Sequence, residues 1–147
     1  IYKKVCGANL QRVLDTIRLY WELGIWIEIT TLIIPFHNDT EDQLAGIAKF
    51  IAGLSAHIPW HISAFYPTYK MTNVPPTPLP ILKRAREIGL AEGLNHIYMG
   101  NVNERSDTLC PECRTALIER GRFRILSNKM DRGRCPQCRA EIAGVWS

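Results

Sequence analysis

The sequence lacks the features that mark membrane and secreted proteins. No apolar run approaches the ~20 residues that a helix needs to cross a bilayer, and the chain does not open on a basic stretch followed by an apolar one, as a signal peptide does. Cysteine is scarce outside one segment, because four of the five cysteines lie in residues 110–138 and Cys6 stands alone. These absences favour a reducing, cytoplasmic setting and no membrane partner.

Motifs of several enzyme classes are also missing. The chain has no Gly-rich phosphate loop, no nucleophile elbow, no internal repeat and no low-complexity tract. The four histidines, His37, His57, His61 and His96, form no ligand pattern, so each is expected at the surface or as a capped core residue. Catalytic residues therefore stay unknown at this stage.

Charge is distributed unevenly along an otherwise ordinary globular composition. The 147 residues are 46% hydrophobic and 22% charged, which suits one domain or one domain with a small appendage. Residues 1–104 hold nine basic and nine acidic side chains, whereas residues 105–147 hold nine basic and five acidic ones, so the net charge of +4 arises in the second segment. That segment is either a solvated basic surface or a site for an acidic partner.

Two Cys-x-x-Cys motifs are the strongest chemical signal. Cys110 and Cys113 form the first, and Cys135 and Cys138 form the second after 21 intervening residues. Each motif puts two thiolates on one tight turn, and two facing turns make the tetrahedral cage that structural zinc prefers. A rubredoxin-like iron is the minor alternative, since four thiolates accept either metal. Two disulfides would require an oxidising compartment.

The arginines of this segment carry two further expectations. Arg114 and Arg139 follow the second cysteine of each motif, where glycine is usual, so these turns should be slightly strained. Basic and other residues alternate over residues 120–124, Arg-Gly-Arg-Phe-Arg, where a strand is expected. Such a strand would suit a nucleic-acid surface, although a solvated edge with Phe123 packed on the metal turns is favoured.

The rest of the chain alternates helices and strands. Helices are expected over residues 10–23, with Asn9 as N-cap and Gly24 after the end, then from a capping box at Thr40 and Gln43, and over residues 81–92. Strands are expected over residues 25–34, 60–66 and 95–99. This order predicts an α/β fold with a parallel sheet. Because three strands cannot close a barrel and the chain begins at Ile1, we expect the second half of a larger (β/α) domain over residues 1–103 and a metal ribbon over 104–147.

Glu28 is the most informative residue outside the cysteines. A carboxylate inside a buried strand is costly unless it is paired or faces a polar cavity. Glu28 and Thr30 share one strand face, and Ser63 and Tyr66 end the next strand, so the four could meet in one cavity. The alternatives are a structural ion pair from Glu28 to a neighbouring element, or an unrelated barrel hydrolase with Glu28 as general base. A stiff loop with five prolines follows in residues 67–80, where α/β folds often place ligand sites.

The order of short motifs resembles a known family. The motifs are Tyr2-Lys3-Lys4-Val5-Cys6-Gly7-Ala8, Trp26 to Pro35, Asn38-Asp39, Pro59-Trp60-His61-Ile62-Ser63, Pro75-Pro76-Thr77-Pro78-Leu79 and Gly100-Asn101-Val102 before the cysteine motifs. Over essentially its whole length the chain is similar to the C-terminal part of the AmmeMemoRadiSam-system radical SAM enzymes, relatives of the pyruvate formate-lyase activating enzymes.

The resemblance implies a partial (β/α) barrel that binds S-adenosylmethionine on a [4Fe-4S] cluster. The cofactor would yield a 5′-deoxyadenosyl radical that takes hydrogen from an unknown substrate, possibly a protein, and a reductant protein is expected. Glu28, Thr30, Ser63 and Tyr66 would line the cofactor or substrate cavity, and Cys110, Cys113, Cys135 and Cys138 would hold a structural zinc in a rubredoxin-like ribbon. The alternative is a non-catalytic zinc ribbon that binds protein or, less favoured, nucleic acid.

The chain departs from the family pattern at two places. The Cys-x-x-x-Cys-x-x-Cys cluster motif is absent, so the cluster ligands are expected before Ile1 and this fragment alone is expected to be inactive. Ala64 and Tyr66 stand where the family tends to have a basic residue and a histidine. Tyr66 can donate a hydrogen bond there but cannot supply positive charge.

Overall fold

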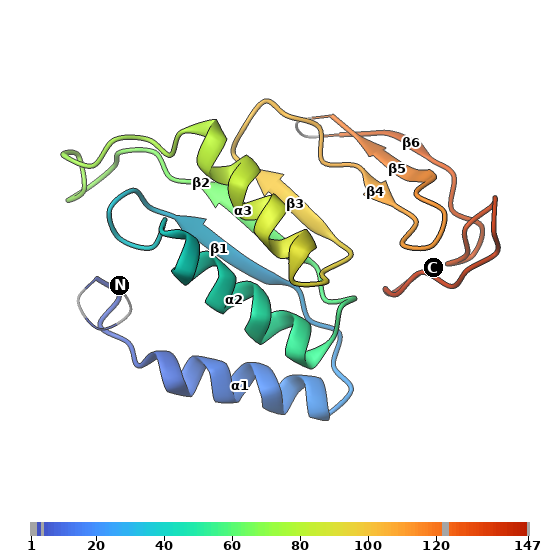
Figure 1. The fold of residues 1–147 in the computed structure, drawn as a ribbon, viewed down its shortest axis with the longest axis horizontal. Coiled ribbons are helices and arrows are strands. Elements are labelled where there is room, and N and C mark those ends of the chain that lie inside the picture. Colours follow the sequence, from blue (N-terminus) through green and yellow to red (C-terminus); the bar gives the residue numbers. More distant parts are fainter. Residues whose placement is uncertain (1–2, 4, 122–123, 147) are drawn as a thin grey trace.

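The computed structural model describes residues 3, 5–121 and 124–146, and within them two separate sheets. The first part comprises α1 (Leu10–Glu22), β1 (Ile29–Ile33), α2 (Glu41–Leu54), β2 (Trp60–Ala64), α3 (Leu79–Ala91) and β3 (Ile97–Gly100). The second comprises β4 (Thr108–Leu109), β5 (Ala116–Arg120) and β6 (Ile125–Asn128). Figure 1 shows the two parts side by side. The α/β class is confirmed, whereas a barrel is not shown.

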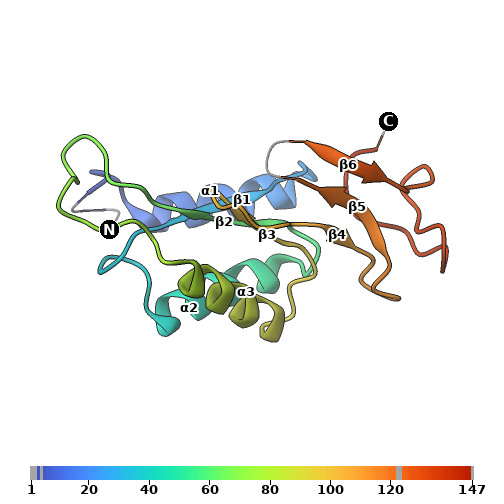
Figure 2. The ribbon, with the colours of Figure 1, turned by 90° about the horizontal axis from the view of Figure 1, so that it is seen from above.

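The first sheet is parallel and has helices on one face. Its strand order is β1-β2-β3, with Ile29 opposite Trp60 and Trp60 opposite Ile97. Helices α2 and α3 cover one face, whereas α1 lies past the β1 side, level with the sheet and outside the layer of α2 and α3 (Figures 1 and 2). Because side chains alternate along a strand, every second residue of β2 is buried toward the helices and the others lie on the opposite face. Among the described residues, no helix covers that second face.

Trp60 is the centre of the helix-facing core. Its side chain is fully buried, and its indole N–H donates to the Thr31 hydroxyl at 2.9 Å. Gly89 of α3 lies directly over it: a Cβ there would be 2.5 Å from Ile97 Cδ1 and 3.0 Å from the Trp60 ring. Glycine is therefore required for α3 to approach the sheet this closely. Residues of α2 and α3 complete this core, namely Leu44, Ala48, Ile51, Leu82, Ala85 and Ile88.

The predicted caps of the first two helices are confirmed, whereas α3 begins two residues before the expected range of 81–92. Asn9 accepts a hydrogen bond from the Gln11 amide at 2.9 Å and caps α1. Thr40 and Gln43 form both halves of a capping box at the start of α2. Gly24 follows α1 with a φ of +73°, a conformation that glycine adopts without strain.

The expectation of a strand over residues 25–34 is wrong at its start. β1 begins only at Ile29, whose amide donates to the Pro59 carbonyl at 2.9 Å. The chain before it is still completing the end of α1, because the Ile25 amide donates to the Tyr20 carbonyl at 3.0 Å. A strand needs a paired neighbour, and β2 starts at Trp60. Glu28 therefore precedes the strand instead of interrupting it.

The carboxyl edge of the sheet is held by side chains from the loops that follow it. The Thr77 hydroxyl donates to the Ile33 carbonyl at 2.5 Å and accepts from the Phe65 amide at 2.8 Å. Asn38 bonds the backbone of residues 32 and 34, and the Asn101 amide donates to the Ala64 carbonyl at 3.1 Å. The proline-rich loop is thus anchored to the ends of both β1 and β2.

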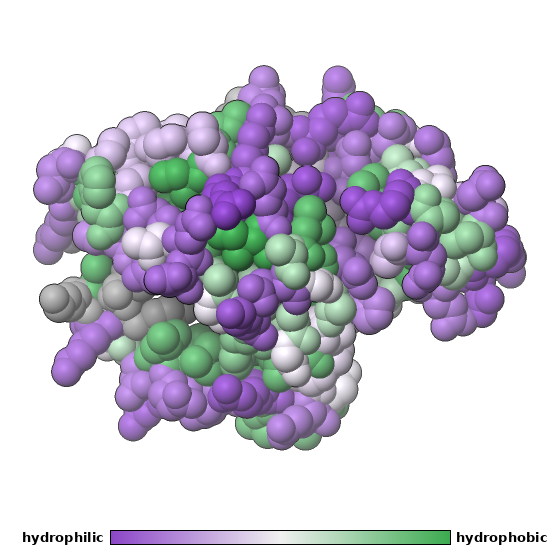
Figure 3. Space-filling model, in the orientation of Figure 1, coloured by the Kyte–Doolittle hydropathy of each residue, from purple (hydrophilic) through white to green (hydrophobic). Residues whose placement is uncertain are grey.

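The second sheet is antiparallel, in the order β4-β5-β6, and has its own small core. The basic run over residues 120–124 was expected to form one strand, and this expectation is wrong. β5 ends at Arg120 and β6 begins at Ile125, and the Gly121 amide donates to the Arg124 carbonyl at 2.8 Å. Arg122 and Phe123 lie outside the described residues, as does the expected packing of Phe123. Hydrophilic residues prevail over this part in Figure 3. None of the described helices combines the length and apolarity that a bilayer crossing demands.

Thr77→Val should destabilise the chain by about 2–3 kcal/mol, because it removes a buried hydroxyl that satisfies two backbone groups while keeping the side-chain shape. Urea unfolding followed by circular dichroism measures the difference. Thr72→Val, at an exposed position of the same loop, is the matched control and should leave the midpoint unchanged. Equal midpoints for the two variants would contradict the anchoring role.

Candidate metal centre and the neighbouring cleft

The two cysteine turns have the same backbone hydrogen bonds. In the first, the Cys110 amide donates to the Thr115 carbonyl at 2.9 Å and the Arg114 amide to the Cys110 carbonyl at 3.0 Å. In the second, Cys135 donates to Ala140 at 2.9 Å and Arg139 to Cys135 at 2.9 Å. Two equivalent turns therefore present their thiols in the same way.

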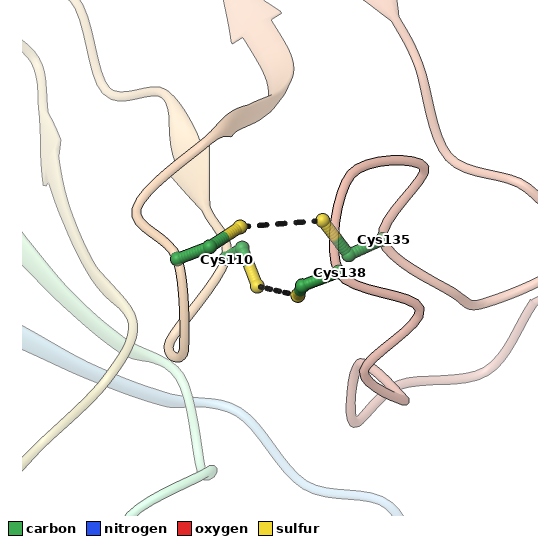
Figure 4. A group of neighbouring side chains, drawn as sticks. Cys110, Cys135 and Cys138 are labelled. Atoms are coloured by element: carbon green, nitrogen blue, oxygen red, sulfur yellow. Dashed lines mark hydrogen bonds between the residues drawn. The ribbon is translucent and has the colours of Figure 1, made fainter.

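The four thiols converge on one point. Their Sγ atoms all lie within 4.8 Å of one another, and the Cys110–Cys138 and Cys113–Cys135 Sγ distances are both 3.6 Å. Figure 4 shows labelled sulfurs of the two turns directed toward each other across the gap between the turns. A metal–sulfur bond of about 2.3 Å gives a tetrahedron with edges of about 3.8 Å, so a thiolate-bound ion such as zinc fits. A disulfide would need about 2.05 Å, so all four cysteines are free thiols in this structure.

The thiols cannot all ionise without a cation. A hydrogen bond with Thr115 holds the pKa of the Cys113 thiol at about 6. A backbone hydrogen bond from Ala140 lowers the pKa of Cys138, but burial and the neighbouring thiols outweigh it and raise the value to about 12. Metal binding would therefore release protons, and a divalent cation would compensate the thiolates' repulsion.

Arginine occupies left-handed backbone positions at both turns, as the sequence predicted. Arg114 has a φ of +63° and Arg139 a φ of +64°, where a side chain with a Cβ is strained. The Arg139 guanidinium gains an ion pair with Asp131 at 2.7 Å, which offsets part of this cost. Among the described residues, no ion pair involves Arg114, so the strain there is uncompensated.

The residues expected to share one cavity are spread along the sheet. Glu28, Thr30 and Ser63 do lie on the face that the helices leave uncovered. However, Glu28 lies level with Pro59, at the amino end, and Ser63 is four residues farther along β2, about 13 Å away. Tyr66 lies beyond the carboxyl end, half exposed, and donates from its hydroxyl to the Asn101 carbonyl at 3.0 Å. Their predicted role as cofactor ligands stays a prediction.

Glu28 has the partner that the sequence left open as an alternative. Its Oε2 lies 2.7 Å from His61 Nε2 on the neighbouring strand, and the His61 ring stacks on Tyr98 with 5.2 Å between ring centroids. The pair is a full ion pair whenever His61 carries a second ring proton. Such a carboxylate–histidine pair can hold or accept a proton from a bound molecule.

A cleft of about 420 Å³ lies where the sheet meets the C-terminal segment of the ribbon. It opens at the amino end of the strands, opposite the edge where Ser63 and Tyr66 lie. Most of the side chains that line it come from positions far apart in the sequence, namely Trp26, Glu28, Pro59, His61, His96, Tyr98, Thr108, Arg120 and residues 143–146. The sequence flagged Glu28 but missed the histidines, because nothing in their spacing distinguishes them.

The basic ribbon uses much of its charge internally. Arg105, Lys129, Arg134 and Arg139 each pair with acidic residues of the same segment. Surface pairs of this kind contribute little stability, yet they leave fewer free cations for a nucleic acid. The nucleic-acid alternative stays a prediction.

Comparison with known proteins yields one relative. No family model matches the chain, and no solved structure matches it. An uncharacterized protein of Methanocaldococcus jannaschii is 44% identical over an alignment of 146 residues, and the match covers 96% of this chain. The chain spans 44% of that relative's length, so more than half of the relative lies outside the match. The similarity names no activity.

Purified chain should contain one bound metal ion, and Cys110→Ser should lose it because the site would keep only three of its four thiols. Since the ribbon core includes two of the cysteines, metal loss should also disorder β5 and β6. Elemental analysis and amide NMR spectra measure both effects. Cys6→Ser, which removes the exposed cysteine outside the cage, is the control and should keep the metal. Equal metal content in both variants would refute the site.

Arg114→Gly should stabilise the metal-bound chain by about 0.5–1 kcal/mol, since relief of the left-handed strain exceeds the backbone entropy that glycine adds to the unfolded state. Chemical unfolding at constant metal concentration measures it. Arg114→Ala removes the same long side chain but keeps the Cβ, and should gain nothing. A similar gain for alanine would trace the effect to charge instead of backbone strain.

Proposed function

We propose that this chain is the C-terminal part of a radical SAM enzyme of the AmmeMemoRadiSam system, in which the sheet is half of a partial (β/α) barrel. The uncovered face of β1–β3 carries this proposal. Barrel strands turn one face to their helices and the other to the lumen, and Thr30 and Ser63 present hydroxyl groups on that second face. These side chains would form one wall of a cofactor or substrate cavity.

The edges of the first part fit a larger sheet. In the part of the chain that the structure describes, β1 pairs with β2 alone, and an unpaired strand edge can accept a further strand. Helix α1 contains no buried residue, and large apolar side chains on it, Leu10, Leu19 and Tyr20, are about half exposed. More than half of the Methanocaldococcus jannaschii relative lies outside the match, which is ample length for the other half of a barrel.

The cysteines of this chain do not fit a [4Fe-4S] cluster. Four of them converge on one mononuclear cage, and Cys6 is exposed and apart from them. The cluster and its bound S-adenosylmethionine would therefore be held by ligands outside residues 1–147. The role proposed for this chain is to position the substrate, exclude water and supply hydroxyl donors at Thr30 and Ser63.

We further propose that the ribbon metal is a structural zinc. Four thiolates complete the tetrahedral coordination of zinc, so the site leaves no open position for catalysis. A set of four cysteine thiolates also accepts iron, as in rubredoxin. Elemental analysis separates the two, and a ferric thiolate site would colour the protein whereas zinc would not.

The test of the radical function uses the full-length protein, expressed with any coding sequence that precedes Ile1 and purified without oxygen. We expect iron and sulfide beyond the metal of the four-cysteine site, an EPR signal of a reduced cluster after dithionite, and formation of 5′-deoxyadenosine from S-adenosylmethionine. Thr30→Val and Ser63→Ala should lower that formation, while Thr68→Val in the exposed loop should not. Full-length protein with no iron–sulfur cluster would disprove the proposal.

A further inference from the structure

Apart from Glu28, which was expected to line the cofactor cavity, the cleft between the sheet and the ribbon is built from side chains to which the radical function assigns no role. It lies at the amino end of the strands, whereas the proposed cofactor wall extends toward their carboxyl end. A volume of about 420 Å³ is within the range of small-molecule sites. Aromatic and charged groups line it together, and three features narrow the class of ligand.

Trp146 forms one wall and is held in place by two glycines. Its indole N–H donates to the Ile142 carbonyl at 2.7 Å. A Cβ at Gly133 would lie 2.6 Å from Trp146 Cδ1, and one at Gly144 would lie 2.7 Å from Cζ2, so the ring rests directly on both backbones. Trp26 also lines the cleft, from the segment before β1. Flat rings from two segments suit a planar apolar ligand.

Arg120 places a guanidinium in the cleft that forms no ion pair with a described carboxylate. Its guanidinium lies over the Tyr98 ring, 5.1 Å from the centroid, and donates to the Thr108 hydroxyl. No acidic side chain of the described residues pairs with it, in contrast to Arg105, Arg134 and Arg139 of the same ribbon. A partly buried guanidinium with free donors is a site for a carboxylate.

His96 lines the same cleft with both ring nitrogens unsatisfied. Its side chain is 4% exposed, and neither Nδ1 nor Nε2 has a hydrogen-bond partner among the described residues. Burial, assisted by the nearby His57, Arg114 and Arg120, lowers the pKa of His96 to about 4. The ring is therefore neutral near pH 7 and offers one N–H donor. A buried polar group is normally paired, so a bound ligand would supply the partner that this ring lacks.

Glu28 is the one acidic residue that lines this cleft, and both of its oxygens already have partners in the wall. His61 Nε2 lies 2.7 Å from its carboxylate, and the Trp26 indole N–H approaches the other oxygen at 3.4 Å. The Glu28 oxygens are thus held by neighbouring side chains, whereas the Arg120 guanidinium has no ion pair among the described residues.

We propose that this cleft binds a small aromatic carboxylate, with the carboxylate on Arg120 and His96 and the ring between Trp26 and Trp146. Binding would bridge the parallel sheet and the metal ribbon, because both parts contribute side chains. The site is independent of the radical function, and its test uses this chain alone.

The probe is benzoate, and the matched control ligand is benzamide, which has the same size and no charge. Binding is followed in ¹H–¹⁵N NMR spectra through the indole N–H signals, assigned with Trp→Phe variants. Benzoate should shift the Trp26 and Trp146 signals, while Trp60 in the core and Trp21 on α1 serve as internal references. Benzamide should bind at least about tenfold more weakly, because it cannot form the charged pair with Arg120.

Two variants test the assigned contacts. Arg120→Gln should weaken benzoate binding by about tenfold or more, whereas Arg12→Gln on the exposed face of α1 should have no effect. Trp146→Ala should weaken benzoate and benzamide equally and, being near the end of the chain, leave the sheet intact. Unchanged benzoate affinity in folded Arg120→Gln, equal binding of the two ligands, or no shift of either cleft indole would overturn the proposal.

Discussion

The alternation of side chains along parallel strands is the constraint on which the rest of the structure depends. It sends Trp60, Ile62 and Ala64 into a core under α2 and α3, and it necessarily places His61 and Ser63 on the other face. Parallel sheets are normally covered on both faces. This one is covered on one face by helices and at its amino end by the ribbon, so the remaining polar surface is where binding can occur.

The ribbon meets a different constraint, since it is too small for an apolar core. Five buried residues form its centre, and two of them are cysteines of the metal site. A bound ion would therefore take the place that further apolar residues fill in a larger domain. The same ion would fix both cysteine turns, and through Ile142, which closes that core, it would also support the segment leading to Trp146.

Local patterns were sufficient to predict much of the fold. The caps at Asn9 and Thr40 and the strained turn at Arg114 depend on neighbouring residues only, and the structure bears them out. The alternating order predicted a parallel sheet, which β1–β3 form. The start of β1 was not predictable, because Ile25 is as strand-like as Ile29 and only the position of β2 decides between them. The division at residues 103 and 104 stays a prediction.

The metal site and the cleft also differ in whether neighbouring residues or distant contacts determine them. The metal site was predictable because its four ligands come in two short motifs, each closed by its own turn. The cleft was not, since His96, Arg120 and Trp146 are brought together only by the packing of the ribbon on the sheet. Because the strand was expected to start at residue 25, Glu28 was predicted to lie inside it and to share a cavity with Ser63. At its true position Glu28 meets His61, which makes the amino end of the sheet, and not only its carboxyl end, a place where this chain can bind a ligand.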